Sequence, residues 1–108
     1  MRSLDPEDVV LMAFPFSGGG SKRRPALVLA DTGDRDIVVA RITTQPYGAS
    51  EDVEIRDWAA AGLLSASIVR VHKVATLERS LVERVLGRLT AADRGAVRTA
   101  VMTLFGSI

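Results

Sequence analysis

The chain has 108 residues, and its 14 lysines and arginines nearly balance its 13 aspartates and glutamates, for a net charge of +1. This balance gives no overall field that would indicate nucleic acid, and 47% hydrophobic with 25% charged residues excludes a disordered chain. The absence of cysteine excludes thiolate nucleophiles, disulfides, iron–sulfur centres and thiolate zinc sites, while one histidine excludes a multi-histidine metal site. The length predicts a single domain over residues 1–108.

Three short apolar runs in the first half of the chain predict strands. Residues 9–14 are apolar throughout and are followed by Pro15, which is typical of a strand buried on both faces. A glycine-rich segment over residues 17–21 predicts a loop, and residues 25–30 predict a second buried strand. Residues 36–43 follow as a third strand after a polar turn. The short connections favour an antiparallel meander.

The second half combines two alternating segments with shorter elements. Residues 52–55 and 67–77 alternate polar and apolar side chains, as half-exposed strands do. Between them, residues 57–62 predict one helical turn with an aspartate cap and a terminating glycine. Residues 81–89 fit a strand or a short helix, and we favour a short turn followed by a strand.

A helix is predicted at the end of the chain. Thr90 and Asp93 have the spacing of a capping box with aspartate in place of glutamate. Arg94 and Arg98 are left for solvent or a partner. An apolar face follows at helical spacing and is expected to enter the core: Val97, Val101, Leu104 and Phe105. The predicted fold is mainly β with α, a small curved antiparallel sheet that forms a partly closed barrel and packs against the carboxy-terminal helix.

Charge and hydropathy vary along the chain in ways that the totals hide. Up to Ala66 there are seven basic and ten acidic residues, for −3, whereas the remainder has seven basic and three acidic residues, for +4. A basic cluster over residues 22–24 lies within the acidic part. Residues 1–8 are acidic where a leader peptide would be basic, and no apolar run approaches the roughly 20 residues that span a bilayer. We therefore expect a cytoplasmic protein that does not enter membranes.

The glycine-rich loop is the first candidate for function. Residues 18–22 invite comparison with a phosphate-binding loop, but the G-x-x-x-x-G-K-[ST] spacing is absent and a strand follows in place of a helix. A flexible lid over a ligand is the simpler interpretation, because three glycines are costly to order. A nucleotide-binding protein remains an alternative, and it predicts thermal stabilisation by nucleotides.

Polar residues at the ends of the predicted strands could bind an anion. Pro25 restricts Arg24 to extended conformations and so holds a guanidinium that matches phosphate oxygens and could stabilise a charged phosphorane. A surface arginine in a turn is the alternative. Thr43 and Thr44 end the third strand, where a hydroxyl can bind a phosphate, a sugar hydroxyl or the neighbouring backbone.

Arg70 and His72 lie on one side of their predicted strand, about 7 Å apart along the chain. A cation beside an imidazole suits acid–base chemistry on a phosphodiester, because the imidazole can exchange a proton near neutral pH. A structural role for a lone histidine in a strand is the alternative.

Motifs along essentially the whole chain carry a family resemblance. They comprise residues 9–17, the glycine loop, and residues 22–29, 40–44, 52–55, 68–72 and 76–77. In this order they resemble the MazF/PemK group of toxin endoribonucleases. The resemblance implies a MazF/PemK/CcdB-like fold and the toxin of a type II toxin–antitoxin pair, a homodimer that cleaves single-stranded RNA without a metal or cofactor. It also implies a cognate antitoxin protein that blocks the RNA groove.

The resemblance assigns roles to individual residues. Arg24 matches the family's catalytic arginine before proline, and Thr43 matches its catalytic threonine. Arg70 and His72 fall where some members place an arginine and an aspartate used in acid–base chemistry, so this chain has histidine in place of the acid. The family pattern opens its first strand with Gly-Asp, where this chain has Glu-Asp at residues 7–8.

The expected mechanism uses the ribose 2′-hydroxyl as nucleophile, which suits a chain without cysteine and with one histidine. Arg24 would hold the phosphorane charge, Thr43 would position the scissile phosphate, and His72 would transfer a proton. Further contacts with RNA are expected from loop residues and basic residues: Phe16, Ser17, Lys22, Arg23, Thr44, Tyr47 and Arg70. The competing interpretation is a non-catalytic small-barrel protein that binds a protein partner or nucleic acid.

Two expectations concern the whole molecule. Because few arginines carry the binding, RNA affinity should depend only weakly on salt concentration. The final helix and the strand before it are the predicted seam of the homodimer.

Overall fold

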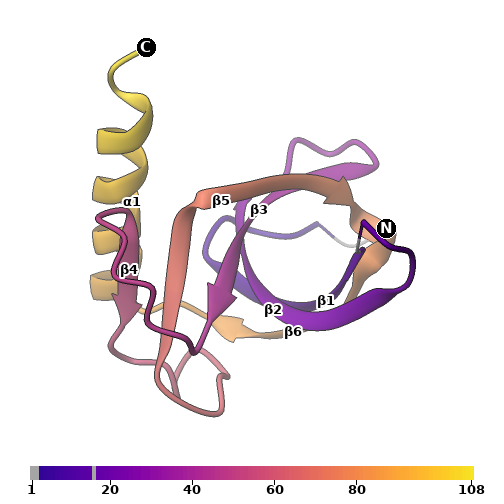
Figure 1. Cartoon of the computed structure of the whole chain (residues 1–108), viewed down its shortest axis with the longest axis horizontal. Helices are drawn as coiled ribbons and strands as arrows, with labels where there is room; N and C mark the ends of the chain where they lie inside the picture. The colour runs from indigo at the N-terminus through magenta and orange to yellow at the C-terminus, as the bar shows by residue number, and fades with distance from the viewer. Residues whose placement is uncertain (1–2, 16) are drawn as a thin grey trace.

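The computed structural model describes residues 3–15 and 17–108, so Phe16, a predicted RNA contact, lies outside the described residues. Within these ranges, six strands form one antiparallel sheet in the order β4-β5-β3-β2-β1-β6. The elements are β1 (Asp8–Pro15), β2 (Ser21–Ala30), β3 (Asp36–Thr43), β4 (Asp52–Ile55), β5 (Ser67–Glu78), η1 (Arg79–Leu81), β6 (Val82–Arg88) and α1 (Ala91–Phe105). This confirms the predicted sheet and carboxy-terminal helix. Figure 1 shows the sheet curling into an open barrel, with α1 standing outside it beside β4.

Irregularities in strand pairing bend the sheet. Along the β3–β5 ladder, Ala40 pairs with Val74 but the next residue, Arg41, pairs with Arg70. Residues 71–73 of β5 are therefore left without a partner on β3, at the corner that β5 makes in Figure 1. Further register shifts occur between β1 and β6 and between β2 and β3. Extra residues of this kind bend a strand and increase its twist, which gives the sheet its curl.

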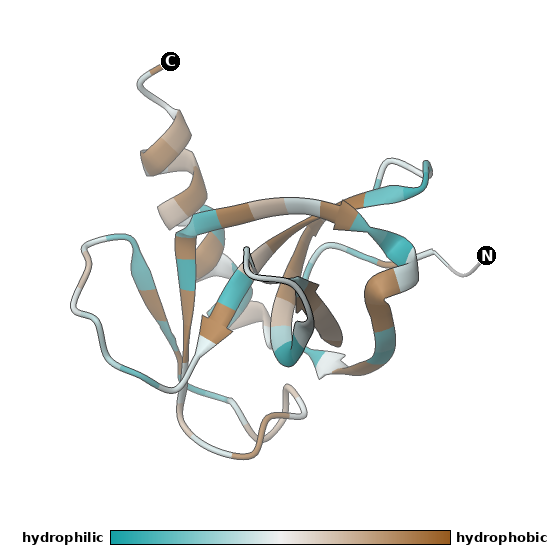
Figure 2. Ribbon diagram, turned by 45° about the vertical axis from the view of Figure 1, so that its right-hand side comes forward, coloured by the Kyte–Doolittle hydropathy of each residue, from teal (hydrophilic) through white to brown (hydrophobic). Residues whose placement is uncertain are grey.

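The curled sheet buries apolar side chains on both faces. One cluster includes Val10, Met12 and Val28, and the other includes Val9 and Leu27 together with Val97 of α1. Successive residues of β1 and β2 thus belong to different clusters, which is why these strands are apolar throughout. Figure 2 shows apolar segments along the strands. The predicted burial of both faces is confirmed.

Strand β2 begins earlier than predicted, at Ser21, so the basic residues 22–24 belong to the strand. Pro25 lies inside β2 and pairs with Leu11 of β1, whereas the ladder with β3 starts only at Ala26. Because proline has no N–H to donate, pairing with β3 begins just after it. The extended conformation expected for Arg24 is confirmed.

Residues 56–62 form hydrogen-bonded turns, and the predicted terminating glycine is confirmed. The Gly62 N–H donates to the Ala59 carbonyl at 3.1 Å, and the Leu63 N–H donates to the Trp58 carbonyl at 3.0 Å. These two bonds, with φ of 83° at Gly62, define a Schellman motif. The cap differs from the prediction, because the Asp57 carboxylate accepts a hydrogen bond from the Thr90 hydroxyl at 2.9 Å.

Helix α1 begins after Thr90, whose hydroxyl accepts from the Asp93 N–H at 3.4 Å, as predicted. The side chain of Asp93, expected to complete the capping box, binds a different segment. The buried Asp93 carboxylate accepts from the backbone N–H groups of Arg56 at 3.1 Å and Asp57 at 2.8 Å. Asp93 therefore fastens the turn over residues 56–62 to the start of the helix.

The predicted apolar face of α1 is confirmed for Val97, Val101 and Leu104, which pack on the cluster beneath the helix. The prediction for Phe105 is wrong, because its side chain is 46% exposed. Phe105 lies in the last turn and is not among the side chains of the described residues that pack on this cluster, so helical spacing alone could not reveal its exposure. No helix of the described residues is long and apolar enough to cross a membrane.

Candidate active site

Strand register brings four polar residues to one face of the sheet. Ala26 of β2 pairs with Arg41 of β3, which in turn pairs with Arg70 of β5. Arg24 and Thr43 each lie two residues beyond the Ala26–Arg41 pair, in the same direction along the sheet. Because side chains two residues apart share a face, Arg24, Arg41, Thr43 and Arg70 lie on one face, here called the arginine face. The alternate residues of these strands face α1.

The basic cluster on β2 is divided by the strand alternation. Lys22 and Arg24 point to one side of the strand, whereas Arg23 points to the other and pairs with Glu83 of β6 at 2.9 Å. Arg24 is exposed, and it makes no ion pair with any described residue. Its guanidinium is therefore available to an anion. Ser17, a predicted RNA contact, is exposed in the loop before β2.

Thr43 ends β3 with its side chain half-buried. Its Oγ1 accepts a hydrogen bond from the Gln45 N–H at 3.1 Å, which is one of the roles anticipated for a hydroxyl at a strand end. The hydroxyl hydrogen remains to be donated, so the same side chain can still bind a phosphate oxygen. Thr44 is exposed in the following loop.

Arg70 is held by two neighbours. Its Nε donates to Oδ1 of Asp52 at 3.1 Å, and both side chains are largely buried, at 12% and 8% exposure. The guanidinium carbon also lies 4.0 Å from the centre of the Tyr47 ring, in the geometry of a cation–π contact. The charge of Arg70 is thus already partly compensated, unlike that of Arg24.

His72 adjoins Arg70, as the alternation predicted. Its Nε2 lies 3.5 Å from an Nη2 of Arg70, and because an arginine can only donate, this contact suits the tautomer that carries its proton on Nδ1. Nδ1 is buried without a hydrogen bond to any described residue, and Oε1 of Glu51 lies 4.0 Å from it. A hydrogen bond from the Ser50 hydroxyl, with a smaller contribution from His72, holds the pKa of Glu51 below its ordinary value. Glu51 is therefore an anion facing the imidazole.

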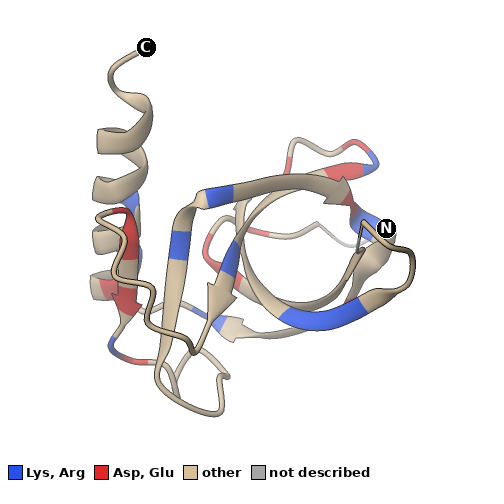
Figure 3. Cartoon of the chain, viewed as in Figure 1, with Lys and Arg blue, Asp and Glu red and all other residues tan. Residues whose placement is uncertain are grey.

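Arg41 is the site residue that sequence reasoning missed. It is exposed on β3 between Ala26 and Arg70, and it makes no ion pair within the described residues. A charged residue in an otherwise apolar strand was the available signal, but only the register shows that it lies beside Arg70. Figure 3 shows basic segments on β2, β3 and β5, the strands that form the arginine face.

The glycine-rich loop connects two antiparallel strands, β1 and β2, and no helix follows it. A phosphate-binding loop of the nucleotide-binding kind places its anion at the amino end of a helix. The alternative of a nucleotide-binding loop therefore lacks its structural context.

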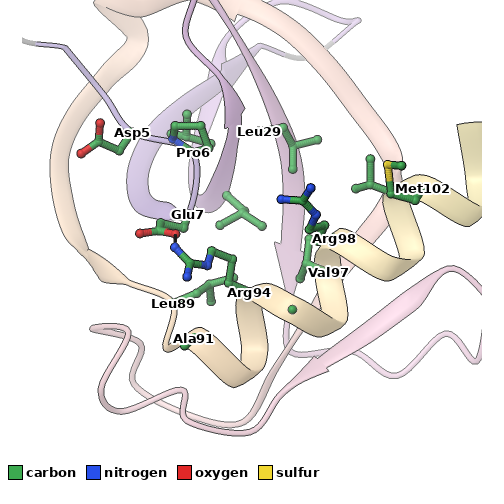
Figure 4. A pocket seen from close by; sticks show the side chains of 14 residues that line it. Asp5, Pro6, Glu7, Leu29, Leu89, Ala91, Arg94, Val97, Arg98 and Met102 are labelled. Atoms are coloured by element: carbon green, nitrogen blue, oxygen red, sulfur yellow. Dashed lines mark hydrogen bonds and ion pairs between the residues drawn. The ribbon is translucent and has the colours of Figure 1, made fainter.

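A groove of about 730 Å³ lies on the opposite side of the sheet, between α1 and the segment before β1. Its floor is apolar and includes Leu27 and Val97, and Figure 4 shows Arg94 reaching across it to an ion pair with Glu7. Arg98 also lines the groove and is exposed. Leu27 follows Ala26 in β2, so its side chain points to the opposite side of the strand. The groove that Leu27 lines is therefore separate from the arginine face.

Glu7 explains one departure from the family pattern. Its φ is 86°, in the left-handed region that favours glycine. The Glu7 N–H donates to the Val28 carbonyl, and the Glu7 carbonyl accepts from the Leu89 N–H, both at 3.0 Å. This conformation accounts for a glycine in the family pattern. Here the carboxylate pairs with Arg94 and, at 3.6 Å, with Arg88.

Comparisons with known proteins agree with this architecture. A family model described as PemK-like, MazF-like toxin of type II toxin–antitoxin system matches residues 5–105. The chain is 30% identical over 91 residues to a protein of Mycolicibacterium smegmatis named probable endoribonuclease MazF, which covers 79% of this chain and 82% of the relative.

Solved structures of the same architecture include toxins and toxin–antitoxin complexes. The Mycobacterium tuberculosis toxin MazF-mt6 is similar with a TM-score of 0.75 at 24% identity, over 92% of this chain and 96% of that one. A MazE–MazF structure from Deinococcus radiodurans has a TM-score of 0.77 at 24% identity, over 97% and 98% of the two chains. An endoribonuclease in complex with its cognate antitoxin, from a mycobacterial species, has a TM-score of 0.74 at 21% identity, over 96% of each chain. These likenesses confirm the predicted fold.

Proposed function

This chain belongs to the PemK-like, MazF-like toxins of type II toxin–antitoxin systems and is an endoribonuclease of that family, and we propose that it cleaves single-stranded RNA without a metal ion. The observation that carries the proposal is the arginine face, where Arg24, which has no ion pair among the described residues, and the hydroxyl of Thr43 lie on neighbouring strands. Single strands suit such a site because the 2′-hydroxyl must swing into line with the leaving oxygen. The site of action proposed for an RNA-cleaving toxin is the cytoplasm.

In the proposed reaction the substrate supplies its own nucleophile. The 2′-oxygen bonds to the phosphorus and the bond to the 5′-oxygen breaks, which leaves a 2′,3′-cyclic phosphate and a 5′-hydroxyl. Arg24 stabilises the charge of the phosphorane, and the Thr43 hydroxyl positions a phosphate oxygen. Arg24 acts through charge, because a pKa above 12 makes arginine a poor base.

His72 is proposed to move the proton. Since Nδ1 is buried, Nε2 is the nitrogen that reaches substrate, and it takes the proton of the attacking 2′-hydroxyl once that hydroxyl replaces its 3.5 Å contact with Arg70. The imidazolium so formed faces the Glu51 carboxylate, 4.0 Å from Nδ1, and then returns the proton to the departing 5′-oxygen. The ring thus ends in the state in which it began.

Cleavage of a mixed-sequence RNA in EDTA, with mapping of the new 5′-hydroxyl ends, tests this proposal. We expect Arg24→Ala, Thr43→Ala and His72→Ala each to lower the rate by about 100-fold or more. Arg35→Ala is the matched control, because Arg35 is an exposed arginine beside the opposite end of β3. Full activity of Arg24→Ala would overturn the electrostatic role.

The proton path has its own test. The rate of the wild-type protein should fall at acidic pH, where a protonated imidazole cannot accept a proton, and His72→Gln should lack this decline. An identical pH–rate profile in the two proteins would remove His72 from the path.

The competing expectation of a non-catalytic small-barrel protein makes the opposite prediction for the same assay. Such a protein would bind RNA or a protein partner yet produce no new 5′-hydroxyl ends in EDTA. The matching family model and the endoribonuclease relative speak against it.

The proposed partners are a second copy of the chain and a cognate antitoxin. Support for a homodimer comes from the exposed apolar side chains of α1, since Met102 is 64% and Phe105 is 46% exposed. Light scattering during gel filtration should give the mass of a dimer for the wild-type chain. Support for an antitoxin comes from the similar fold of solved antitoxin complexes.

A further inference from the structure

Tyr47 presents an aromatic ring beside the arginine face. The Arg70 guanidinium carbon lies 4.0 Å from the ring centre and so covers one face of the ring. The tyrosine nevertheless remains 58% exposed, so its second face and its edge are open to solvent. An open aromatic face is the feature on which proteins stack the bases of single-stranded nucleic acids.

A buried carboxylate holds both the arginine that covers the ring and the loop that carries the ring. One oxygen of Asp52 accepts from Arg70 Nε at 3.1 Å, and the other accepts from the Ala49 N–H at 3.3 Å. The Asp52 N–H donates in turn to the Ala49 carbonyl at 3.1 Å. Asp52 therefore ties the loop that carries Tyr47 to the arginine beneath its ring. A ring placed in advance loses less conformational entropy when a base stacks on it.

Arg41 provides a free cation next to this stack. It pairs directly with Arg70 across β3 and β5, and residues so paired have neighbouring side chains. The two arginines differ in their surroundings, because Arg70 is bound to Asp52 whereas Arg41 is exposed and makes no ion pair within the described residues. A phosphate entering this region would therefore meet Arg41.

We propose that Tyr47, supported by Arg70 and Asp52, stacks on one purine base of the RNA and that Arg41 binds an adjacent phosphate. This nucleotide subsite rests on the proposed function, since it assumes that RNA lies along the arginine face. Tyr47 selects the base, whereas Arg41 adds affinity that does not depend on sequence. A purine is favoured over a pyrimidine because it offers the larger stacking surface to the ring.

Binding without cleavage isolates the subsite from the chemistry. The probe is a short single-stranded RNA in which fluorine replaces every 2′-hydroxyl, with 2-aminopurine placed at one position after another. Stacking quenches the fluorescence of this base, so the wild-type chain should quench it most strongly at a single position. At that position, uracil in place of the purine should weaken binding.

The Tyr47 variants separate stacking from other effects. We expect Tyr47→Phe to keep the quenching, and Tyr47→Leu to lose it and to weaken binding of the purine probe by about fivefold or more. Arg35→Ala, remote from the subsite, is the control and should behave as wild type. Equal quenching by wild type and Tyr47→Leu at every position would overturn the stacking role.

Arg41 has a different signature, which is the salt dependence of binding. Arg41→Ala should weaken purine and pyrimidine probes equally and should make the slope of log K against log salt shallower by about 0.7, the contribution of one phosphate on a single strand. Tyr47→Leu should leave that slope unchanged. A slope unaltered by Arg41→Ala would overturn the phosphate contact.

The subsite and the proposed function fail in distinguishable ways. Localised quenching by a wild-type protein that cleaves no natural RNA would leave the subsite standing and contradict the chemistry. Cleavage of natural RNA without localised quenching would contradict the subsite alone. If the wild-type chain bound neither the purine probe nor the uracil probe, both the RNA substrate and the subsite would be overturned.

Discussion

At the scale of single residues, the buried pair of Asp31 and Arg79 joins the residue after β2 to the residue after β5. Arg79 Nη1 donates to Asp31 Oδ2 at 2.6 Å, and a second hydrogen bond joins Nη2 to Oδ1. The Asp31 carboxylate also accepts from the Leu4 N–H at 2.8 Å and the Gly33 N–H at 3.0 Å. These donors, Arg79 first, hold the pKa of Asp31 well below its ordinary value.

Asp31 should therefore make stability depend on acid. Its pKa is lower in the folded than in the unfolded chain, so the stabilisation is complete above the ordinary value of 3.8 and is lost as pH falls below it toward the folded value. Asp31→Asn should lower the urea midpoint at pH 7 and flatten its dependence on pH below about 4. Glu54→Gln, at an exposed position on β4, is the control. Parallel pH curves for wild type and Asp31→Asn would contradict this role.

A second residue-scale prediction concerns the left-handed backbone at Glu7. Both Glu7→Gly and Glu7→Ala remove the ion pairs with Arg88 and Arg94, but only glycine adopts a φ of 86° without strain. Glu7→Gly should therefore be more stable than Glu7→Ala by about 1 kcal/mol in chemical denaturation. Equal stability of the two variants would show that the backbone relaxes at this position.

At the scale of elements, the turn over residues 56–62 joins the sheet to the helix. The Asp93 carboxylate of α1 accepts hydrogen bonds from the first N–H groups of this turn. The last residues of the turn pack against β6 so closely that no side chain fits between them. A Cβ at Gly87 would lie 2.5 Å from the Ala61 carbonyl oxygen, and one at Gly62 would lie 2.1 Å from the Leu86 carbonyl oxygen. The two glycines thus allow the backbone of the turn to contact the backbone of β6.

Alanine at either glycine should disrupt this contact. Gly62→Ala and Gly87→Ala should each lower the free energy of unfolding by about 2 kcal/mol or more, because the obstructing atoms are backbone. Gly95→Ala is the matched control within α1, where nothing lies within 4 Å of the added methyl group. That change should raise stability by about 0.5–1 kcal/mol. Thermal or urea unfolding measures all three, and a neutral Gly87→Ala would contradict the close approach.

At the scale of the whole molecule, a net charge of +1 conceals how unevenly the described arginines are paired with acidic residues. Arg23, Arg35, Arg70, Arg79, Arg88 and Arg94 all form ion pairs with acidic residues. On the arginine face, Arg24 and Arg41 are the arginines without such a pair among the described residues. Binding of an anionic strand therefore depends on placement rather than on bulk charge.

This distribution predicts a shallow salt dependence for RNA binding. With two or three phosphates neutralised, log K for the 2′-fluoro probe should fall with log salt at a slope of about −1.4 to −2. Titrations between about 50 and 200 mM salt give the slope. A value steeper than about −4 would mean that many more cations contact the strand.

Much of the fold could be predicted from the sequence, because hydropathy and turn residues act locally. The apolar runs of β1 and β2 predicted strands buried on both faces, and the threonine before α1 predicted its start. The exposure of Phe105 could not be predicted in the same way. Helical periodicity places it on the apolar side, but only tertiary packing decides whether other side chains cover it.

The sequence by itself determined the types of chemistry available, the strands and the alternation that puts Arg70 beside His72, since these follow from composition and local geometry. Tertiary structure alone decided which arginines form ion pairs. Asp52 and Glu83 neutralise Arg70 and Arg23 across strands, while Arg41, which register places beside Arg70, has no ion pair within the described part of the chain. Register and ion pairing join residues distant in the chain, so no local pattern reports them.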